Sequence, residues 1–94
     1  MKIEWLPVAE CNLARQLAYI AERNPWAAIE MGDSIEAAVQ HLAGHPHMGR
    51  PGRVKGTREL VVSGTPYVIA YRAEPGAVVI LRVLHGAQRW PAEL

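Results

Sequence analysis

The stretch Tyr67–Leu84, YVIAYRAEPGAVVILRVL, is the strongest indication of the fold, because it contains two predicted apolar strands joined by a turn. Tyr67–Arg72 and Val78–Leu84 are rich in Val, Ile, Leu and Tyr, the residue types that favour strands. Glu74-Pro75-Gly76 between them has the composition of a turn. Such apolar strands need another layer against which to bury one face. The rest of the chain has to supply that layer.

A third strand and two helices are predicted upstream of this pair. Arg58–Val62 has the same strand-like composition, and Ser63-Gly64-Thr65-Pro66 supplies the turn that leads to Tyr67. Between residues 8 and 44 the apolar residues recur with helical spacing, first from Val8 to about Arg23 and then up to Gly44. Asn24-Pro25 separates the two helices, because Asn caps free N–H groups and Pro is tolerated at the first helical position.

The order of elements defines the fold class. Lys2–Trp5 alternates polar and apolar residues, which predicts a short strand before the first helix. The order is therefore β-α-α-β-β-β, and we expect one α+β two-layer domain over residues 1–94, with a helical hairpin packed on an antiparallel sheet. Arg58, Arg72 and Arg82 interrupt apolar strands, so we expect them at accessible positions on the face that the helices leave uncovered.

Positive charge is concentrated in the second half of the chain. Residues 1–48 hold three Lys and Arg against six Asp and Glu, whereas residues 49–94 hold seven against three. The stretch Gly49–Leu60, GRPGRVKGTREL, contains four of these cations, namely Arg50, Arg53, Lys55 and Arg58. Clustered cations favour polyanions or an acidic protein partner. A nucleotide P-loop is excluded, because Lys is followed here by Gly and not by Ser or Thr; a solvated turn is the alternative.

Other residues limit the compartment and the chemistry. Cys11 is the only cysteine, which excludes an internal disulfide and favours a reducing compartment, and its helical position predicts packing in the core. The closely spaced His41, His45 and His47 lack a carboxylate partner, so we predict no metal site. No apolar run approaches the roughly 20 residues of a membrane span. We therefore expect a soluble cytoplasmic protein.

The C-terminal stretch Arg82–Pro91, RVLHGAQRWP, allows two interpretations. His85 has a side chain that can exchange protons near neutral pH, which suits a general acid or base. The alternative is a histidine that bonds the backbone at a strand end, with Trp90 packed as a lid.

Several motifs in this order resemble the RelE/ParE superfamily of bacterial toxins from type II toxin–antitoxin modules. They are Ile3-Glu4-Trp5, GRPGRVKGTREL, PYVIAYR at residues 66–72 and ILRVLHGAQRWP at residues 80–91. The resemblance covers nearly the whole chain and implies the β-α-α-β-β-β fold. It also implies a cognate antitoxin as partner and contact with operator DNA only through that antitoxin. We expect no cofactor and no membrane association.

The superfamily has two branches with different targets. RelE-like members cleave messenger RNA on the ribosome, and cleaving relatives typically carry an arginine just after the start of the middle strand and a Tyr or His near the C-terminus. Here Val68 follows Tyr67, and no Tyr or His follows His85. The tail HGAQRW looks closer to ParE-like members, which inhibit DNA gyrase and are not nucleases.

We therefore predict a ParE-like gyrase inhibitor, with a RelE-like endoribonuclease as the alternative. The residues expected to bind the target are Arg50, Arg53, Lys55, Arg58, Arg72, Gln88, Arg89 and Trp90. If the chain is a ribosome-dependent nuclease, the resemblance leaves a reduced catalytic set of Arg58, Arg82 and His85.

Overall fold

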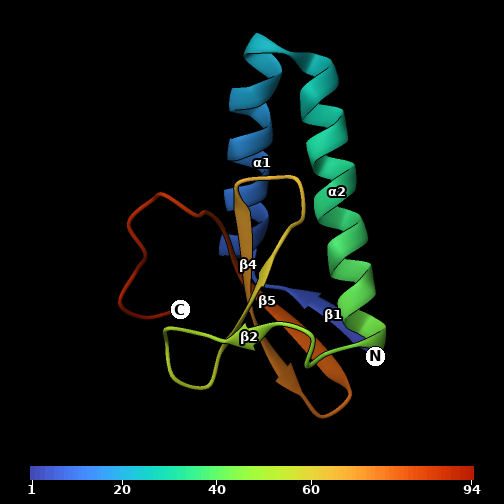
Figure 1. The fold of residues 1–94 in the computed structure, drawn as a ribbon, viewed down its shortest axis with the longest axis vertical. Helices are drawn as coiled ribbons and strands as arrows, with labels where there is room; N and C mark the ends of the chain where they lie inside the picture. Colours follow the sequence, from blue (N-terminus) through green and yellow to red (C-terminus); the bar gives the residue numbers. More distant parts are fainter.

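The computed structural model describes all 94 residues and confirms the predicted α+β arrangement of two helices on a sheet (Figure 1). Two long helices form an antiparallel hairpin, and the strands lie beside its lower part. In chain order, the elements are β1 (Lys2–Trp5), α1 (Pro7–Arg23), α2 (Pro25–Gly44), β2 (Arg50–Pro51), β3 (Arg58–Val61), β4 (Tyr67–Glu74) and β5 (Ala77–His85).

The sheet has five strands in the order β1-β5-β4-β3-β2. β3, β4 and β5 pair antiparallel, as expected from the turns between them. β1 pairs parallel with β5, so the complete sheet is mixed and not purely antiparallel. The additional strand β2 falls in the basic stretch, where the sequence predicted only a loop.

Asn24 acts at both helix ends, as the sequence predicted. Its backbone N–H donates to the Ile20 carbonyl at 2.8 Å and so closes α1. Its side-chain oxygen accepts a hydrogen bond from the N–H of Ala27 at 3.1 Å and so caps α2. One residue therefore fixes the turn of the hairpin.

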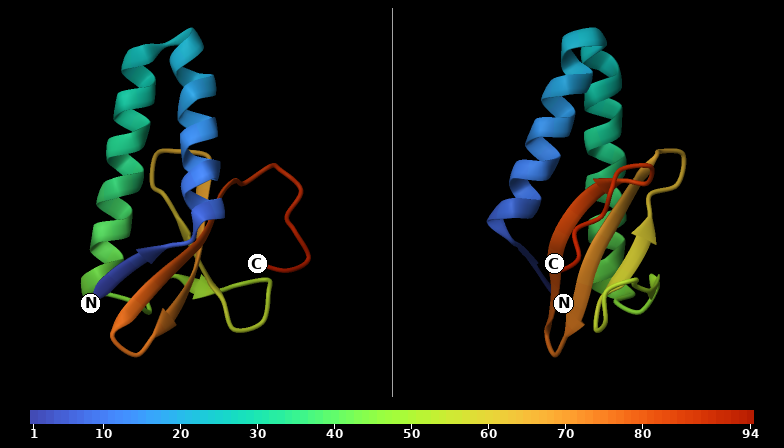
Figure 2. Two further views of the ribbon diagram at one scale, coloured as in Figure 1. Left: turned by 180° about the vertical axis from the view of Figure 1, so that it is seen from behind. Right: turned by 90° about the vertical axis from the view of Figure 1, so that its left-hand side faces the viewer.

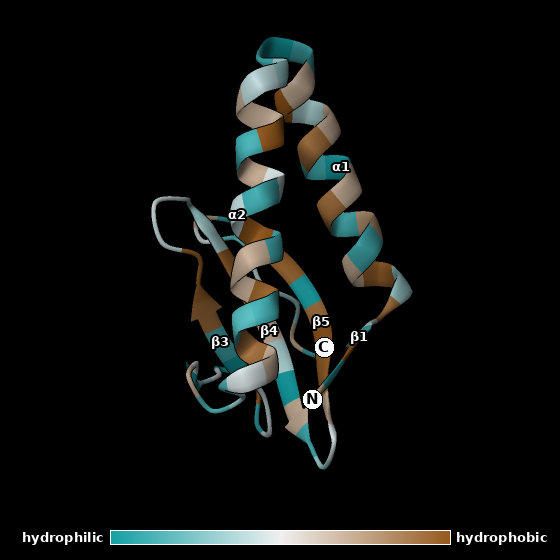
Figure 3. Ribbon diagram, turned by 90° about the vertical axis from the view of Figure 1, so that its right-hand side faces the viewer, coloured by the Kyte–Doolittle hydropathy of each residue, from teal (hydrophilic) through white to brown (hydrophobic).

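One face of the sheet packs on the helices and forms the main core. Ala9, Ile35, Val39 and Leu42 of the helices are buried there. They meet buried side chains of the sheet region, namely Val62, Tyr67, Ile69, Tyr71, Val78, Ile80 and Val83. In Figure 3, β5 is hydrophobic along most of its length, as a central strand buried on its faces should be.

The helical hairpin extends well past the sheet (Figures 1 and 2). Tyr19, Trp26 and Ile29 lie in this distal part and are 61%, 69% and 56% exposed. The expectation that Cys11 packs in the core was wrong, because its position on α1 faces solvent. Neither helix is apolar enough over a sufficient length to cross a membrane.

Candidate functional site

Strand register divides the predicted site residues between the two faces of the sheet. Directly paired residues share a face, and successive residues alternate. Tyr67 pairs with His85, and both therefore lie on the side covered by the helices. Ala70 pairs with Glu59 and with Arg82, which places these three on the opposite side, here called the open face.

A tight loop carries three of the six predicted target-binding cations, namely Arg50, Arg53 and Lys55. This basic loop, residues 49–57, is closed by a hydrogen bond from the Gly52 N–H to the Thr57 carbonyl at 2.8 Å. The Thr57 hydroxyl donates to the Val54 carbonyl at 2.6 Å. A Cβ atom at Gly52 would collide with Thr57, and Gly56 has a φ of +81°. These two positions therefore require glycine.

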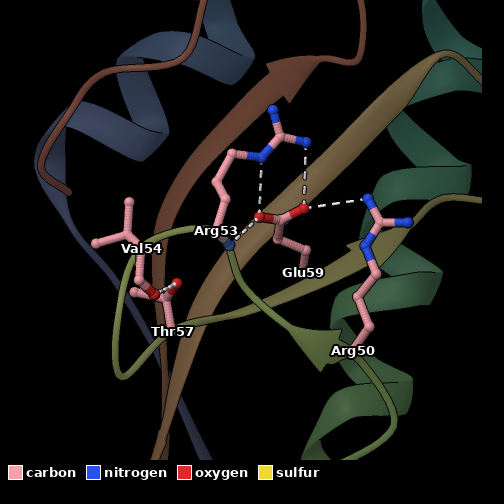
Figure 4. A network of polar contacts seen from close by, with 5 residues as sticks. All are labelled: Arg50, Arg53, Val54, Thr57 and Glu59. Atoms are coloured by element: carbon pink, nitrogen blue, oxygen red, sulfur yellow. Dashed lines mark hydrogen bonds and ion pairs between the residues drawn. The ribbon is translucent and has the colours of Figure 1, made fainter.

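Glu59 holds the basic loop through two arginines (Figure 4). Its carboxylate accepts hydrogen bonds from Arg50 Nη2 at 3.1 Å and from Arg53 Nε at 3.2 Å. The backbone N–H of Arg53 also donates to it, at 2.8 Å. Glu59 is only 3% exposed, whereas the two arginine side chains are about half exposed. The carboxylate thus fixes the arginines while leaving part of each guanidinium accessible.

The Glu59 carboxyl remains ionised because its partners outweigh its burial. Desolvation alone would raise the pKa of this group. The hydrogen bonds from the Arg53 backbone and side chain and from Arg50, with the positive charge of Arg53, lower the pKa below its ordinary value. At neutral pH this group is therefore a carboxylate that neutralises part of the charge of the loop.

The C-terminal segment is attached to the same loop. It turns back from the end of β5 (Figure 2), and the Arg53 guanidinium stacks on the Trp90 ring with 3.7 Å between the guanidinium carbon and the ring centroid. Such cation–π contacts join a charged group to an apolar one. The indole Nε1 of Trp90 is buried without a hydrogen-bond partner. Trp90 is therefore a packed residue that joins the C-terminal segment to the basic loop.

Four other predicted target-binding residues, Lys55, Arg72, Gln88 and Arg89, lie outside the Glu59 contacts. Lys55 and Arg89 are exposed and form no ion pair. Arg72 makes an exposed ion pair with Glu74 at 3.1 Å. Gln88 lies apart from the basic loop, beside α1, and its side-chain oxygen accepts from the His85 N–H at 2.8 Å.

Arg58 has a structural position that the sequence did not suggest. It pairs with Tyr71, so it lies on the helix-facing side and not on the open face as expected. Its Nη1 donates to the Gly49 carbonyl at 2.7 Å. Tyr71 is fully buried, and its hydroxyl donates to the Pro46 carbonyl at 2.8 Å and accepts from the Gly49 N–H at 2.9 Å. Together these two side chains fix the segment between α2 and β2.

The reduced catalytic set does not converge. Arg82 is on the open face, whereas Arg58 and His85 are on the opposite side. Arg58 on β3 pairs with Tyr71 of β4, whereas His85 on β5 pairs with Tyr67, four residues earlier in β4. Arg58 and His85 therefore lie on strands on either side of β4 and at different positions along it. One scissile phosphate therefore cannot meet all three side chains in this arrangement.

His41 and His45, at the end of α2, form a pair of tilted rings. The rings of His41 and His45 lie 4.8 Å apart. No third His, Cys, Asp or Glu side chain is close enough to complete a metal site with them. Their position suits a helix C-terminus, where the dipole favours cationic side chains.

Sequence reasoning missed the two residues that organise this region, Glu59 and Tyr71. An acidic residue inside an apolar strand and next to a cluster of arginines was an available signal for Glu59. Tyr71 gave no such signal, because a tyrosine in a strand is ordinary. Its role depends on the approach of Gly49, where a Cβ atom would lie 2.6 Å from the Tyr71 hydroxyl oxygen.

Comparison with known proteins gives one consistent family. Residues 3–90 match the family described as "ParE toxin of type II toxin-antitoxin system, parDE". The chain is 44% identical over 93 residues to Y4kP of Sinorhizobium fredii, covering 99% of this chain and 96% of that protein. It is 36% identical over 89 residues to "Toxin RelE3" of Caulobacter vibrioides, covering 93% and 96% of the two chains.

The fold also matches a known structure. A chain of the chromosomal ParDE toxin–antitoxin system from P. aeruginosa superposes with a TM-score of 0.79 at 24% sequence identity. The match covers 88% of this chain and 92% of that one. At this identity the match supports the fold alone.

Proposed function

The chain belongs to the ParE toxin family of type II toxin–antitoxin systems, and we propose that it inhibits DNA gyrase by binding and is neutralised by a cognate antitoxin. On this proposal the toxin is not an enzyme. Its target contacts the open face and the basic loop that borders it. Operator DNA is contacted only through the antitoxin, in the cytoplasm.

The separation of Arg58, Arg82 and His85 carries this proposal. Cleavage of a ribose–phosphate backbone needs a base, an acid and charge stabilisation at one phosphate. Binding needs only a preorganised surface, and the arginines of the basic loop are already ordered by Glu59. A surface whose side chains are fixed before binding loses less entropy on association.

A RelE-like nuclease is the second candidate, favoured by the 36% identity to a protein named RelE3. This function would require His85 to act with groups other than Arg58 and Arg82. Replacing His85 with Gln would then lower messenger RNA cleavage by about 10²–10⁴-fold.

The test measures supercoiling by purified gyrase in the presence of the protein. The wild-type chain should inhibit, and Lys55→Glu should weaken inhibition, because Lys55 is exposed and its replacement leaves the Glu59 contacts intact. Lys2→Glu is the matched control, since it makes the same charge change on β1, at the opposite edge of the sheet.

A parallel map of messenger RNA ends in expressing cells separates the two candidates. We expect filamentation with intact messages. Full supercoiling in the presence of a several-fold molar excess of folded protein, with messages cut at ribosome-occupied codons, would overturn the proposal.

A further inference from the structure

A cleft lined mainly by residues with polar side chains lies between α1 and the C-terminal half of β5, on the side of the sheet that the helices cover. Its lining includes Asn12, Arg15, Gln16, Tyr67, His85 and Gln88. None of the residues that line it is acidic. The cleft lies apart from the basic loop and its Glu59 contacts.

The wall formed by β5 is a strand edge whose backbone groups already have hydrogen-bond partners. β1 ends opposite Ile80, so the next residues of β5 have no strand partner on that side. Asn12 Oδ1 accepts from the Val83 N–H at 3.4 Å, and Gln16 Nε2 donates to the Val83 carbonyl at 2.7 Å. The side-chain oxygen of Gln88 accepts from the His85 N–H at 2.8 Å, and the Gln88 backbone N–H donates to the His85 carbonyl at 3.0 Å. A partner therefore cannot add a strand here and must use side-chain groups.

The polar groups of the cleft that remain free to bind a partner are mainly hydrogen-bond donors. The Ala87 N–H donates to His85 Nδ1 at 3.1 Å, so the neutral ring carries its proton on Nε2. Tyr67 is 7% exposed, and its hydroxyl has no partner in the protein. Burial raises the pKa of the Tyr67 phenol, which keeps the hydroxyl protonated. Arg15 is exposed and forms no ion pair.

A guanidinium, a phenol O–H and an imidazole N–H around one cleft are suited to an oxyanion. A nucleic acid strand presents a regular series of phosphates and is usually matched by a run of cations. Arg15 is the only permanent cation of this cleft. The chemistry therefore favours one carboxylate carried by a polypeptide.

We propose that this cleft binds an Asp or Glu side chain of the antitoxin, with Arg15 as its ion partner. The inference rests on the proposed toxin–antitoxin pairing but not on the identity of the target. The antitoxin would thus be anchored on the helix side of the sheet, away from the open face.

The experiment measures the affinity of the full-length toxin variants for the coexpressed, purified cognate antitoxin by calorimetry. Arg15→Glu should weaken binding by at least about tenfold, because it places like charges together. Tyr67→Phe keeps the packing, removes only the hydroxyl and should weaken binding less. Lys2→Glu, with the same charge change on an exposed strand, should bind as the wild type does. Thermal unfolding of each variant checks the fold.

A charge swap makes the test specific. Among antitoxin variants with single Asp or Glu residues changed to Lys, one should restore binding to the Arg15→Glu toxin. Equal affinities for Arg15→Glu and wild type would overturn the inference, as would equal weakening by Lys2→Glu. If Arg15→Glu instead weakens binding of a single-stranded oligonucleotide and leaves the antitoxin affinity unchanged, the cleft is a phosphate site and the inference is wrong.

The result of the antitoxin-binding experiment does not depend on whether gyrase is the target. A wild-type protein that leaves gyrase unaffected would overturn gyrase inhibition, yet the charge swap with the antitoxin would still stand.

Discussion

The two faces of the sheet are closed in different ways. The helix-facing side is buried by aliphatic and aromatic side chains, among them Leu42, Ile69 and Ile80. At the edge of the open face, the basic loop and the C-terminal segment are held mainly by one carboxylate, two arginines and one stacked tryptophan. Apolar burial depends little on pH or salt, whereas charged contacts depend on both. The helix-facing side therefore contains the main apolar core, whereas the edge of the open face carries an ordered charged surface.

The largest effect should come from a cavity on the helix-facing side. Leu42 is fully buried, and Leu42→Ala should lower the free energy of unfolding by about 2–5 kcal/mol. Urea unfolding measures this loss. Ile29→Ala is the control, because Ile29 is 56% exposed and its truncation should change stability by about 0.5 kcal/mol or less. Similar losses in the two variants would contradict the assignment of the core to this face.

Removing the charge of Glu59 should have the next largest effect. Glu59→Gln weakens hydrogen bonds to two arginines, and we expect a loss of about 1.5–3 kcal/mol in the free energy of unfolding. The arginines are half exposed and can be rehydrated, which limits the loss. Glu74→Gln, in an exposed pair with Arg72, should cost about 0–1 kcal/mol. A smaller loss for Glu59→Gln than for Glu74→Gln would sink this account of the loop.

The same residue predicts a pH dependence of stability. The pKa of Glu59 is lower in the folded chain than its ordinary value of 4.5, so its contribution is present above that pH and is lost as the pH falls through the folded value. The stability difference between wild type and Glu59→Gln should therefore be constant from neutral pH down to about 4.5 and shrink below it. Urea unfolding of both proteins at several pH values tests this; a difference that grows on acidification would have the wrong sign.

The smallest effect should come from the tail. Trp90→Ala removes the stack on Arg53, worth about 0.5–2 kcal/mol, and should loosen the C-terminal segment more than it lowers global stability. Amide hydrogen exchange should show faster exchange near residues 86–90 and little change in β4. Trp26→Ala is the matched control, because Trp26 is 69% exposed on the helical hairpin. If amide exchange near residues 86–90 is as slow in Trp90→Ala as in the wild type, Trp90 does not hold the C-terminal segment in place.

Much of the architecture follows from local sequence signals. Asn24-Pro25 marks the hairpin turn because both residues have strong positional preferences at helix ends. The turns at Ser63–Pro66 and Glu74–Gly76 fixed the antiparallel order of β3, β4 and β5. The parallel pairing of β1 had no such signal, because alternation defines the faces of a strand but not its neighbour or its direction.

The candidate site was only partly predictable. The basic loop was located from composition, but the carboxylate that orders it was not singled out, because a side chain 9 residues from Arg50 becomes its partner only through strand pairing. The set Arg58, Arg82 and His85 came from residue types alone. Which face each residue occupies depends on register, which residue types do not give.

Local sequence patterns were enough to predict both helices, four of the five strands, the order of these elements and the basic character of the segment after α2. Which charged groups come together depends instead on strand pairing in the folded chain. In β5 an irregularity in pairing makes Tyr71 face Ile80 and Ala70 face Arg82, so that Leu81 is an extra residue. Strict alternation would have put Arg82 on the side of Val78 and Ile80, and the one-residue bulge moves it to the open face. Successive side chains of a strand point to opposite faces, so one extra residue in a bulge moves every later side chain to the other face. The residue types and their spacing in the sequence do not show where such a bulge occurs.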